Sequence, residues 1–183
     1  RDIEDEVAEC YRKLSLRCGL PAAPVAVRSS ATAEDLEDAS FAGQQDTFLN
    51  VLGPESLLQA VVQCWSSLWT ARAIGYRLRN QVEQQAIALA VIVQRMVESQ
   101  AAGVLFTANP LTGLRSETVI DASFGLGEAL VSGLVEPDHY LVDPAAGSIR
   151  AKTLGRKAVS IHGERQGGTR LLEQDRSVLP ALP

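Results

Sequence analysis

The sequence predicts an α+β fold, and two patterns indicate it. Apolar residues recur at helical spacing in residues 2–17 and again in residues 54–80, which is typical of helices with one buried face. Short apolar or alternating runs, bounded by proline and glycine, recur in residues 25–51 and 87–162 and predict strands. Many of these strands follow one another directly, so we expect mixed, mostly antiparallel sheets with flanking helices.

The first half of the chain holds the long predicted helices. Asp2 is a plausible N-cap, Gly19 follows the end of the first helix, and Pro54 suits the first position of the second. Trp65 and Trp69 lie four residues apart, and we expect them to pack in the core. The expected helices are Asp2–Arg17, Pro54–Trp69 and a further piece to about Asn80, and the expected strands are Val25–Ser29 and Thr47–Val51.

The second half predicts mainly short strands. Ile87–Val97 is continuously apolar, which is typical of a buried strand rather than an edge strand. From Gly163 the chain becomes polar and glycine-rich, so residues 164–183 are expected to form a polar tail. The other expected elements are strands at Gly103–Thr107, Glu117–Ser123, His139–Val142, Ser148–Thr153 and Ala158–His162, a turn at Asn109–Gly113 and a short helix at Glu128–Ser132.

Composition excludes several functional classes. The 183 residues carry a net charge of −5 without a basic patch, which argues against nucleic acid as a partner. The longest apolar runs are too short to span a membrane. The three cysteines, Cys10, Cys18 and Cys64, have no metal-binding spacing, so we expect free thiols in a cytoplasmic protein.

The stretch from Val25 to Val51 is the most informative part of the chain. An apolar run ends on Arg28, and small hydroxylated residues, four acids and a small-residue loop follow. A fixed cation beside small residues that allow close backbone approach is suited to binding an anion such as phosphate. The residues alone leave open an ordinary hairpin with a surface arginine, because no known glycine-rich phosphate motif fits.

Four strings extend this pattern along the chain. They are VRSSATAEDLEDASFAGQQDTFLNV at Val27–Val51, AVIVQRMV at Ala90–Val97, GVLFTANPLTG at Gly103–Gly113 and DASFGLGEALVSGLVEPDHYLVD at Asp121–Asp143. Together they resemble the ATP-binding domain shared by phosphoenolpyruvate synthase, pyruvate phosphate dikinase and rifampicin phosphotransferase, over about Leu14–Gly168. The resemblance implies an ATP-grasp fold, with residues 1–183 as the central part of one such domain and a lobe split near residues 82–98.

The resemblance also implies where ATP would bind. Arg28 matches an arginine that contacts the nucleotide phosphates, and the loop from Ser40 to Gly43 would cover the β- and γ-phosphates. Gln44 begins the strand after this loop. The hydroxyl of Thr47 would reach a phosphate or ribose oxygen, although a strand threonine explains it equally well.

The end of the Ile87–Val97 strand resembles the hinge that reads adenine. Gln94 is a nucleotide candidate there, and Met96 is either a wall of the adenine site or core. Glu128 at a helix start is explained by the helix dipole, with a metal role as the alternative. Lys157 is expected to be solvated rather than to meet a phosphate, and His139 and His162 are expected to be structural.

Phosphoryl transfer needs Mg²⁺ and more than one cation. In the family, an upstream lysine and a second, downstream arginine supply the further cations, and a downstream glutamate and glutamine hold the Mg²⁺; we expect these groups outside this chain. Gln174–Arg176 resembles the Gln-x-Arg-Pro end of the family's metal-binding segment. It lacks the preceding apolar strand and the following proline, so we interpret it as unrelated to that segment. The isolated chain is therefore expected to lack catalysis and to bind ATP weakly or not at all.

By resemblance, the whole enzyme is a dikinase-type phosphotransferase. It would convert ATP to AMP and phosphate through a phosphohistidine on a swivelling domain, with pyruvate or a rifamycin as the small-molecule acceptor. A non-catalytic ATP-grasp remnant with a regulatory or scaffold role is the alternative from another class. An ATP-grasp ligase, which would release ADP, fits the strings poorly.

Overall fold

The computed structural model describes residues 2–31, 35–36, 39–40, 46–80 and 87–182. The chain forms two compact units. The first unit contains Arg1–Met96 together with Glu164–Gly168, and the second contains Val97–Gly163 together with Thr169–Pro183. The combination of helices and antiparallel sheets confirms the predicted α+β class.

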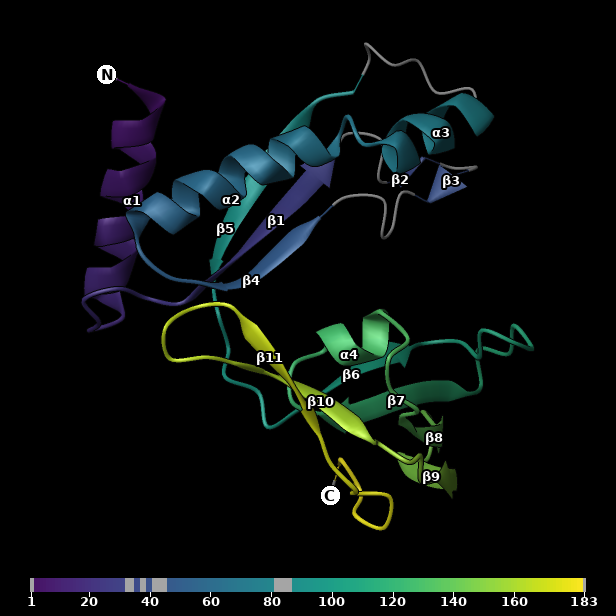
Figure 1. Ribbon diagram of the computed structural model, residues 1–183. Coiled ribbons are helices and arrows are strands. Elements are labelled where there is room, and N and C mark those ends of the chain that lie inside the picture. Colours follow the sequence, from purple (N-terminus) through teal and green to yellow (C-terminus); the bar gives the residue numbers. More distant parts are fainter. Residues whose placement is uncertain (1, 32–34, 37–38, 41–45, 81–86, 183) are drawn as a thin grey trace. The chain divides into compact units, whose positions relative to one another are not determined.

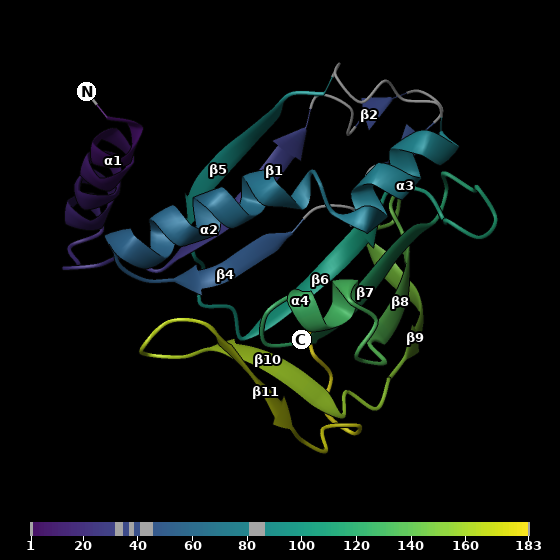
Figure 2. The ribbon, with the colours of Figure 1, turned by 45° about the horizontal axis from the view of Figure 1, so that its top comes forward.

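The first unit is built on a three-stranded antiparallel sheet in the order β4-β1-β5, with α2 packed along one face (Figures 1 and 2). A two-residue pair, β2 with β3, adds a second small sheet. The elements are α1 (Ile3–Arg17), β1 (Val25–Ala31), β2 (Asp35–Leu36), β3 (Ala39–Ser40), β4 (Thr47–Val51), α2 (Pro54–Ser67), α3 (Ala71–Arg79) and β5 (Leu89–Arg95).

The core of the first unit lies between this sheet and its helices. Val25 and Val27 of β1 are fully buried, while Arg28 is exposed on the opposite face. β5 alternates in the same way, with Ile92 and Gln94 exposed, although Ala26 on the Arg28 side of β1 is also buried. The buried cluster consists of Tyr11, Val25, Val27, Leu57, Ala60, Val61 and Cys64. The uncovered face is therefore the one that can present polar side chains to a ligand.

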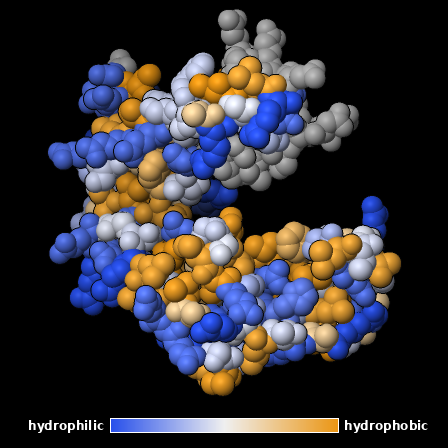
Figure 3. Space-filling view, turned by 45° about the vertical axis from the view of Figure 1, so that its right-hand side comes forward, coloured by the Kyte–Doolittle hydropathy of each residue, from blue (hydrophilic) through white to orange (hydrophobic). Residues whose placement is uncertain are grey.

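Two burial predictions for the first unit are wrong. The run Ile87–Val97 was expected to be a buried strand, but β5 is only half covered and pairs only with β1 among the described residues. Trp65 and Trp69 were expected in the core, but their exposed fractions are 42% and 62%. The buried stripe of α2 runs through Leu57, Ala60, Val61 and Cys64, so Trp65 lies beside it. Apolar side chains also reach the surface elsewhere (Figure 3).

Asn50 holds a distant segment of the first unit. Its backbone is left-handed (φ 55°), and its side chain is 7% exposed. The side-chain amide donates to the carbonyl oxygens of Glu164 at 2.8 Å and Gly168 at 2.6 Å. The amide of Gly168 donates back to the Asn50 carbonyl at 2.8 Å. Glu164–Gly168 is thereby fixed against the end of β4.

The second unit contains a four-stranded antiparallel sheet in the order β6-β7-β8-β9 and a separate hairpin of β10 with β11. The elements are β6 (Ala101–Phe106), β7 (Thr118–Phe124), α4 (Glu128–Val131), β8 (Asp138–Asp143), β9 (Ser148–Thr153), β10 (Val159–Gly163) and β11 (Thr169–Glu173). Each strand expected in this region is present. β11 lies within the stretch expected to be a polar tail, and Ala181 beyond it is buried against Ala122 and Tyr140.

A buried ion pair replaces the solvated lysine predicted at position 157. Lys157 and Asp138 have no exposed side-chain surface, and the Lys157 ammonium pairs with the Asp138 carboxylate. Asp138 also accepts hydrogen bonds from the amides of Gly155 (3.0 Å) and Ala181 (2.7 Å). Lys157 donates to the Gly155 carbonyl at 2.7 Å. A buried charge needs such partners. Here the partners of Asp138 lie 17 to 43 residues further along the chain, so the local sequence pattern does not predict the burial.

Candidate functional site

The uncovered face of the β4-β1-β5 sheet brings together three of the predicted site residues. Arg28 of β1 is directly opposite Thr47 of β4 and Ile92 of β5. Residues opposite one another in an antiparallel pair project from the same face. Thr47, Arg28 and Ile92 therefore form a row across the sheet, and all three are exposed.

Gln94 extends this row diagonally. It pairs with Ala26, two residues before Arg28, and it is exposed. Diagonal neighbours of this kind are separated by about 7–8 Å, within reach of long side chains. Arg28, Thr47 and Gln94 thus share one face. We call Thr47, Arg28 and Gln94 the polar row.

Met96 lies just beyond β5, at the same end as Gln94. Its amide donates to the Pro24 carbonyl at 2.9 Å, and the residue is half-buried. That amide is therefore already occupied. A contribution of Met96 to a ligand site would have to come from its side chain or its carbonyl oxygen.

The predicted phosphate loop is only partly described. Ser40 lies in β3, where it pairs with Asp35. Gly43 and Gln44 fall outside the described residues. Their predicted roles therefore stay predictions.

Arg28 carries the positive charge of the polar row. Within the described part of the chain, no carboxylate forms an ion pair with it. Its guanidinium is permanently charged and presents planar donors that match phosphate or carboxylate oxygens. An exposed cation on a sheet face, beside a threonine hydroxyl, is chemically suited to binding an anionic group.

Cys64 packs against the strands beneath the polar row from the core side. Its sulfur lies 3.7 Å from the Val27 carbonyl oxygen and 3.6 Å from that of Asp46. These two residues immediately precede Arg28 and Thr47. Burial, and secondarily the negative charge of Asp46, raises the pKa of the Cys64 thiol to about 11. The thiol is therefore a neutral structural group rather than a nucleophile.

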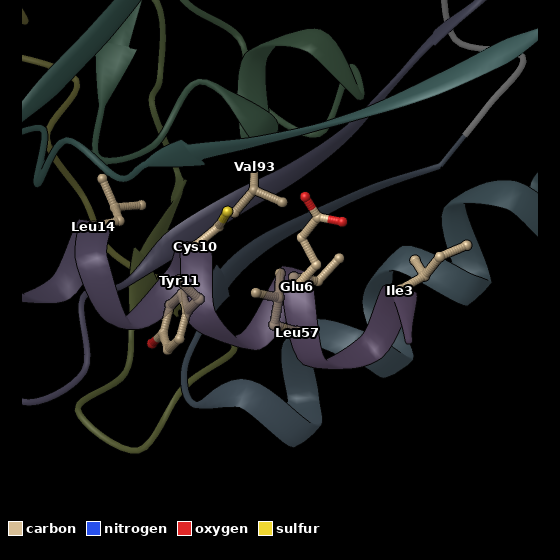
Figure 4. Close-up of a pocket in the computed structure, with 8 residues that line it drawn as sticks. Ile3, Glu6, Cys10, Tyr11, Leu14, Leu57 and Val93 are labelled. Carbon is tan, nitrogen blue, oxygen red and sulfur yellow. The ribbon is translucent and has the colours of Figure 1, made fainter. Parts of the chain in front are cut away.

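A separate hollow of about 350 Å³ lies between α1, α2 and β5. Figure 4 shows side chains of α1, including Glu6 and Cys10, beside Val93 of β5 and Leu57 of α2. The lining is mostly apolar and offers one carboxylate and no cation. None of the predicted site residues lines it, so we do not assign it to anion binding.

The remaining candidates lie in the second unit and have local partners. The Nδ1 atom of His139 is 2.7 Å from the Asp121 carboxylate, and His162 is 2.9 Å from the Ser160 hydroxyl. Glu128 is exposed in the first turn of α4, where the helix dipole stabilises it.

Gln174–Arg176 was interpreted from sequence as unrelated to the family's metal-binding segment, partly because no strand was expected before it; that reason is wrong, since β11 ends directly before Gln174. The Arg176 guanidinium lies over the ring of Phe124, 4.7 Å from the ring centre. The described residues contain no cluster of three or more metal-binding side chains. No helix in the same described segments has the length and apolar character needed to cross a membrane.

Comparison with known proteins assigns the family. Residues 1–179 match the family described as "Pyruvate phosphate dikinase, AMP/ATP-binding domain". The chain belongs to the pyruvate phosphate dikinase AMP/ATP-binding domain family. This confirms the resemblance seen in the four sequence strings, and it makes a nucleotide the ligand that members of this family bind.

Relatives within the family carry two kinds of name. A probable phosphoenolpyruvate synthase of Pyrococcus abyssi is 50% identical over 160 residues, covering 87% of this chain and 20% of the relative. A rifampicin phosphotransferase of Streptomyces sviceus is 48% identical over 182 residues, covering 98% of this chain and 21% of the relative. A rifampicin phosphotransferase of Bacillus cereus is 54% identical over 144 residues, covering 79% of this chain and 16% of the relative. The chain thus spans about a fifth of the length of these relatives.

Sequence reasoning missed one contact beside the polar row of this dikinase-family domain. Arg72 of α3 forms an ion pair with Asp46, at 3.1 Å between Nη2 and Oδ1. The two residues are 26 positions apart and belong to different elements. Neither periodicity nor a motif links them, so only the fold reveals the pair.

Proposed function

We propose that this chain is the ATP-binding portion of a dikinase-type phosphotransferase. The observation that carries the proposal is the polar row: Arg28, Thr47 and Gln94 share one exposed sheet face in a member of an AMP/ATP-binding family. The ATP-grasp label and the assignment of residues 1–183 to one such domain stay predictions.

In this proposal, the residues of the polar row have distinct roles. Arg28 binds phosphate oxygens through paired, charge-assisted N–H donors. The Thr47 hydroxyl, opposite it in the sheet, donates to a neighbouring oxygen. Gln94 and the Met96 side chain contribute at the adenine end. The backbone of Ser40, Gly43 and Gln44 approaches the phosphates.

The residues described in this chain form no ready-made protein site for Mg²⁺. No cluster of three or more carboxylate, histidine or cysteine side chains occurs among them. The acid nearest the polar row in sequence, Asp46, is paired with Arg72. We therefore derive no step through the metal and retain the hypothesis that its ligands lie outside these 183 residues.

For the whole protein, the proposed reaction converts ATP to AMP and phosphate and passes a phosphoryl group through a histidine of a mobile domain to a small acceptor. Pyruvate is the acceptor in a phosphoenolpyruvate synthase and a rifamycin in the second branch. Relatives bearing both names are about equally similar to this chain, at 48–54% identity. The acceptor is therefore the open part of the proposal.

Nucleotide product analysis of the full-length protein tests the reaction type. Incubation with Mg·ATP and either pyruvate or rifampicin is expected to give AMP and phosphate. ADP as the sole product would instead indicate a ligase-type reaction. Binding of ATP without consumption of ATP, pyruvate or rifampicin would favour a regulatory or scaffold remnant.

Calorimetry on residues 1–183 alone tests the expected incompleteness of the site. We expect weak or undetectable heat with Mg·ATP, because the polar row offers the triphosphate one cation, Arg28. Micromolar affinity, or AMP production by these 183 residues, would refute that expectation.

A further inference from the structure

The residue that precedes Thr47 is held from two directions. The Asp46 carboxylate pairs with the guanidinium of Arg72 at 3.1 Å, and the Asp46 carbonyl oxygen lies 3.6 Å from the sulfur of Cys64. Thr47 is the first residue of β4 and lies opposite Arg28. The start of the strand that carries Thr47 is therefore fixed by both α2 and α3.

The Arg72 side of this contact is itself well ordered by hydrogen bonds. The Ser67 hydroxyl donates to the Cys64 carbonyl at 2.7 Å, and the Thr70 hydroxyl donates to the Ser67 carbonyl at 3.0 Å. Thr70 then caps α3 by accepting from the Ala73 amide at 3.3 Å. These bonds define the corner between α2 and α3, so Arg72, in the first turn of α3, projects from a fixed backbone.

We propose that Arg72 is a positioning residue for the polar row. Through Asp46 it holds the start of β4, so that the Thr47 hydroxyl lies beside Arg28 where the phosphates bind. This inference rests on the proposed function. It adds a residue that does not itself touch the nucleotide.

The energetics separate this role from a simple stabilising one. The Arg72 and Asp46 side chains are 53% and 47% exposed, and half-exposed ion pairs contribute little to folding. Loss of the pair should therefore leave the unfolding temperature nearly unchanged. Its effect should appear in ligand affinity, because a small displacement of a binding group weakens binding disproportionately.

The test measures the affinity of the full-length protein for Mg·ATP and for adenosine. In Arg72→Ala and in Asp46→Ala, we expect ATP to bind about two- to fivefold more weakly, the range that a half-exposed ion pair can supply, with adenosine affinity unchanged. The charge-reversed double variant, Asp46→Arg with Arg72→Asp, should recover most of the ATP affinity. The matched control is Arg150→Ala, which removes a surface ion pair with Asp143 in the second unit and should leave both affinities unchanged.

Three outcomes would overturn the inference alone, given a wild-type protein that binds ATP and an Arg28→Ala variant that binds it more weakly. The first is unchanged ATP affinity in both single variants. The second is an equal loss for ATP and adenosine, which would indicate a general structural defect. The third is a loss in Arg72→Ala but not in Asp46→Ala, which would mean that Arg72 contacts phosphate directly. If wild type does not bind Mg·ATP, the proposed function fails as well.

Discussion

The two units use their charged residues in opposite ways. In the first unit, Arg28 lies on an uncovered sheet face and has no ion pair within the described segments. In the second, Lys157 is fully buried and bound to Asp138 and to the Gly155 carbonyl. The sequence predicted Arg28 as a phosphate contact and Lys157 as a solvated residue. Their surroundings separate a group that is free to bind a ligand from one that is already committed to the fold.

This difference has a physical origin. A buried charge must be neutralised and hydrogen-bonded within the protein, so its binding capacity is consumed there. An exposed charge keeps its capacity and contributes little to stability. The polar row and the Asp138–Lys157 pair should therefore respond to mutation in different measurements, the first in ligand affinity and the second in the free energy of unfolding.

The largest expected effect is on the buried pair. Asp138→Ala should lower the free energy of unfolding by about 3–5 kcal/mol, because it leaves the Lys157 charge buried without its partner. It also orphans the amides of Gly155 and Ala181. Urea unfolding measures the loss. Arg150→Ala, which removes a partly exposed ion pair with Asp143, should cost about 1 kcal/mol or less. Equal losses for the two variants would contradict the contrast.

Arg28→Ala should give the converse result. We expect the binding free energy of the full-length protein for Mg·ATP to weaken by about 1.5–3 kcal/mol, the range for hydrogen bonds to charged groups. The urea midpoint should stay at the wild-type value, because Arg28 is exposed and has no described ion pair. Arg28→Lys keeps the charge but not the planar donors, so it should recover only part of the affinity. A drop in stability without a drop in affinity would place Arg28 in the same class as Lys157.

The elements of the fold were largely predictable because their signals are local. Thr47–Val51 and Ser148–Thr153 have the bounds that the sequence predicts. Burial was less predictable, because it depends on what the rest of the chain places against a residue. Trp69 and Lys157 show this in opposite directions, one exposed where core was expected and the other buried where solvent was expected.

The candidate site was predictable only where the chain matches a family string. That match marked Arg28, Thr47 and Gln94, but not that they share a face. Face is set by strand register, here Arg28 with Thr47 and Ala26 with Gln94, and register is a long-range property. The Arg72–Asp46 pair left no sequence signal, because its members are brought together only by packing of α3 near the start of β4.

Asn50 provides an intermediate case, since it is a buried polar residue in the unit that also presents Arg28. Asn50→Gly keeps the left-handed backbone but removes the bonds to Glu164 and Gly168, which should cost about 1–3 kcal/mol. Asn50→Ala should cost about 1 kcal/mol more, because alanine disfavours positive φ. Hydrogen exchange of the Gly168 amide, which bonds to Asn50, should rise in both variants. Unchanged protection at Gly168 would show that the segment is held by other contacts.

At neutral pH the smallest effect is expected at Cys64, the buried group beneath the polar row, whose contribution changes only at alkaline pH. Its pKa is raised from 9.0 to about 11, so the folded state favours the protonated thiol more than the unfolded state does. The resulting stability is fully present below pH 9.0 and is lost as pH rises toward about 11, because the unfolded chain then binds fewer protons. Cys64→Ser should remove the decline in stability attributable to this thiol between pH 9 and 11.

Native protein at pH 8 should react with a thiol reagent rapidly at exposed Cys10 and only after unfolding at Cys64. Rapid native reaction at Cys64 would instead mean that α2 separates from β1 and β4, and the polar row would then lack the rigid support on which its assignment depends.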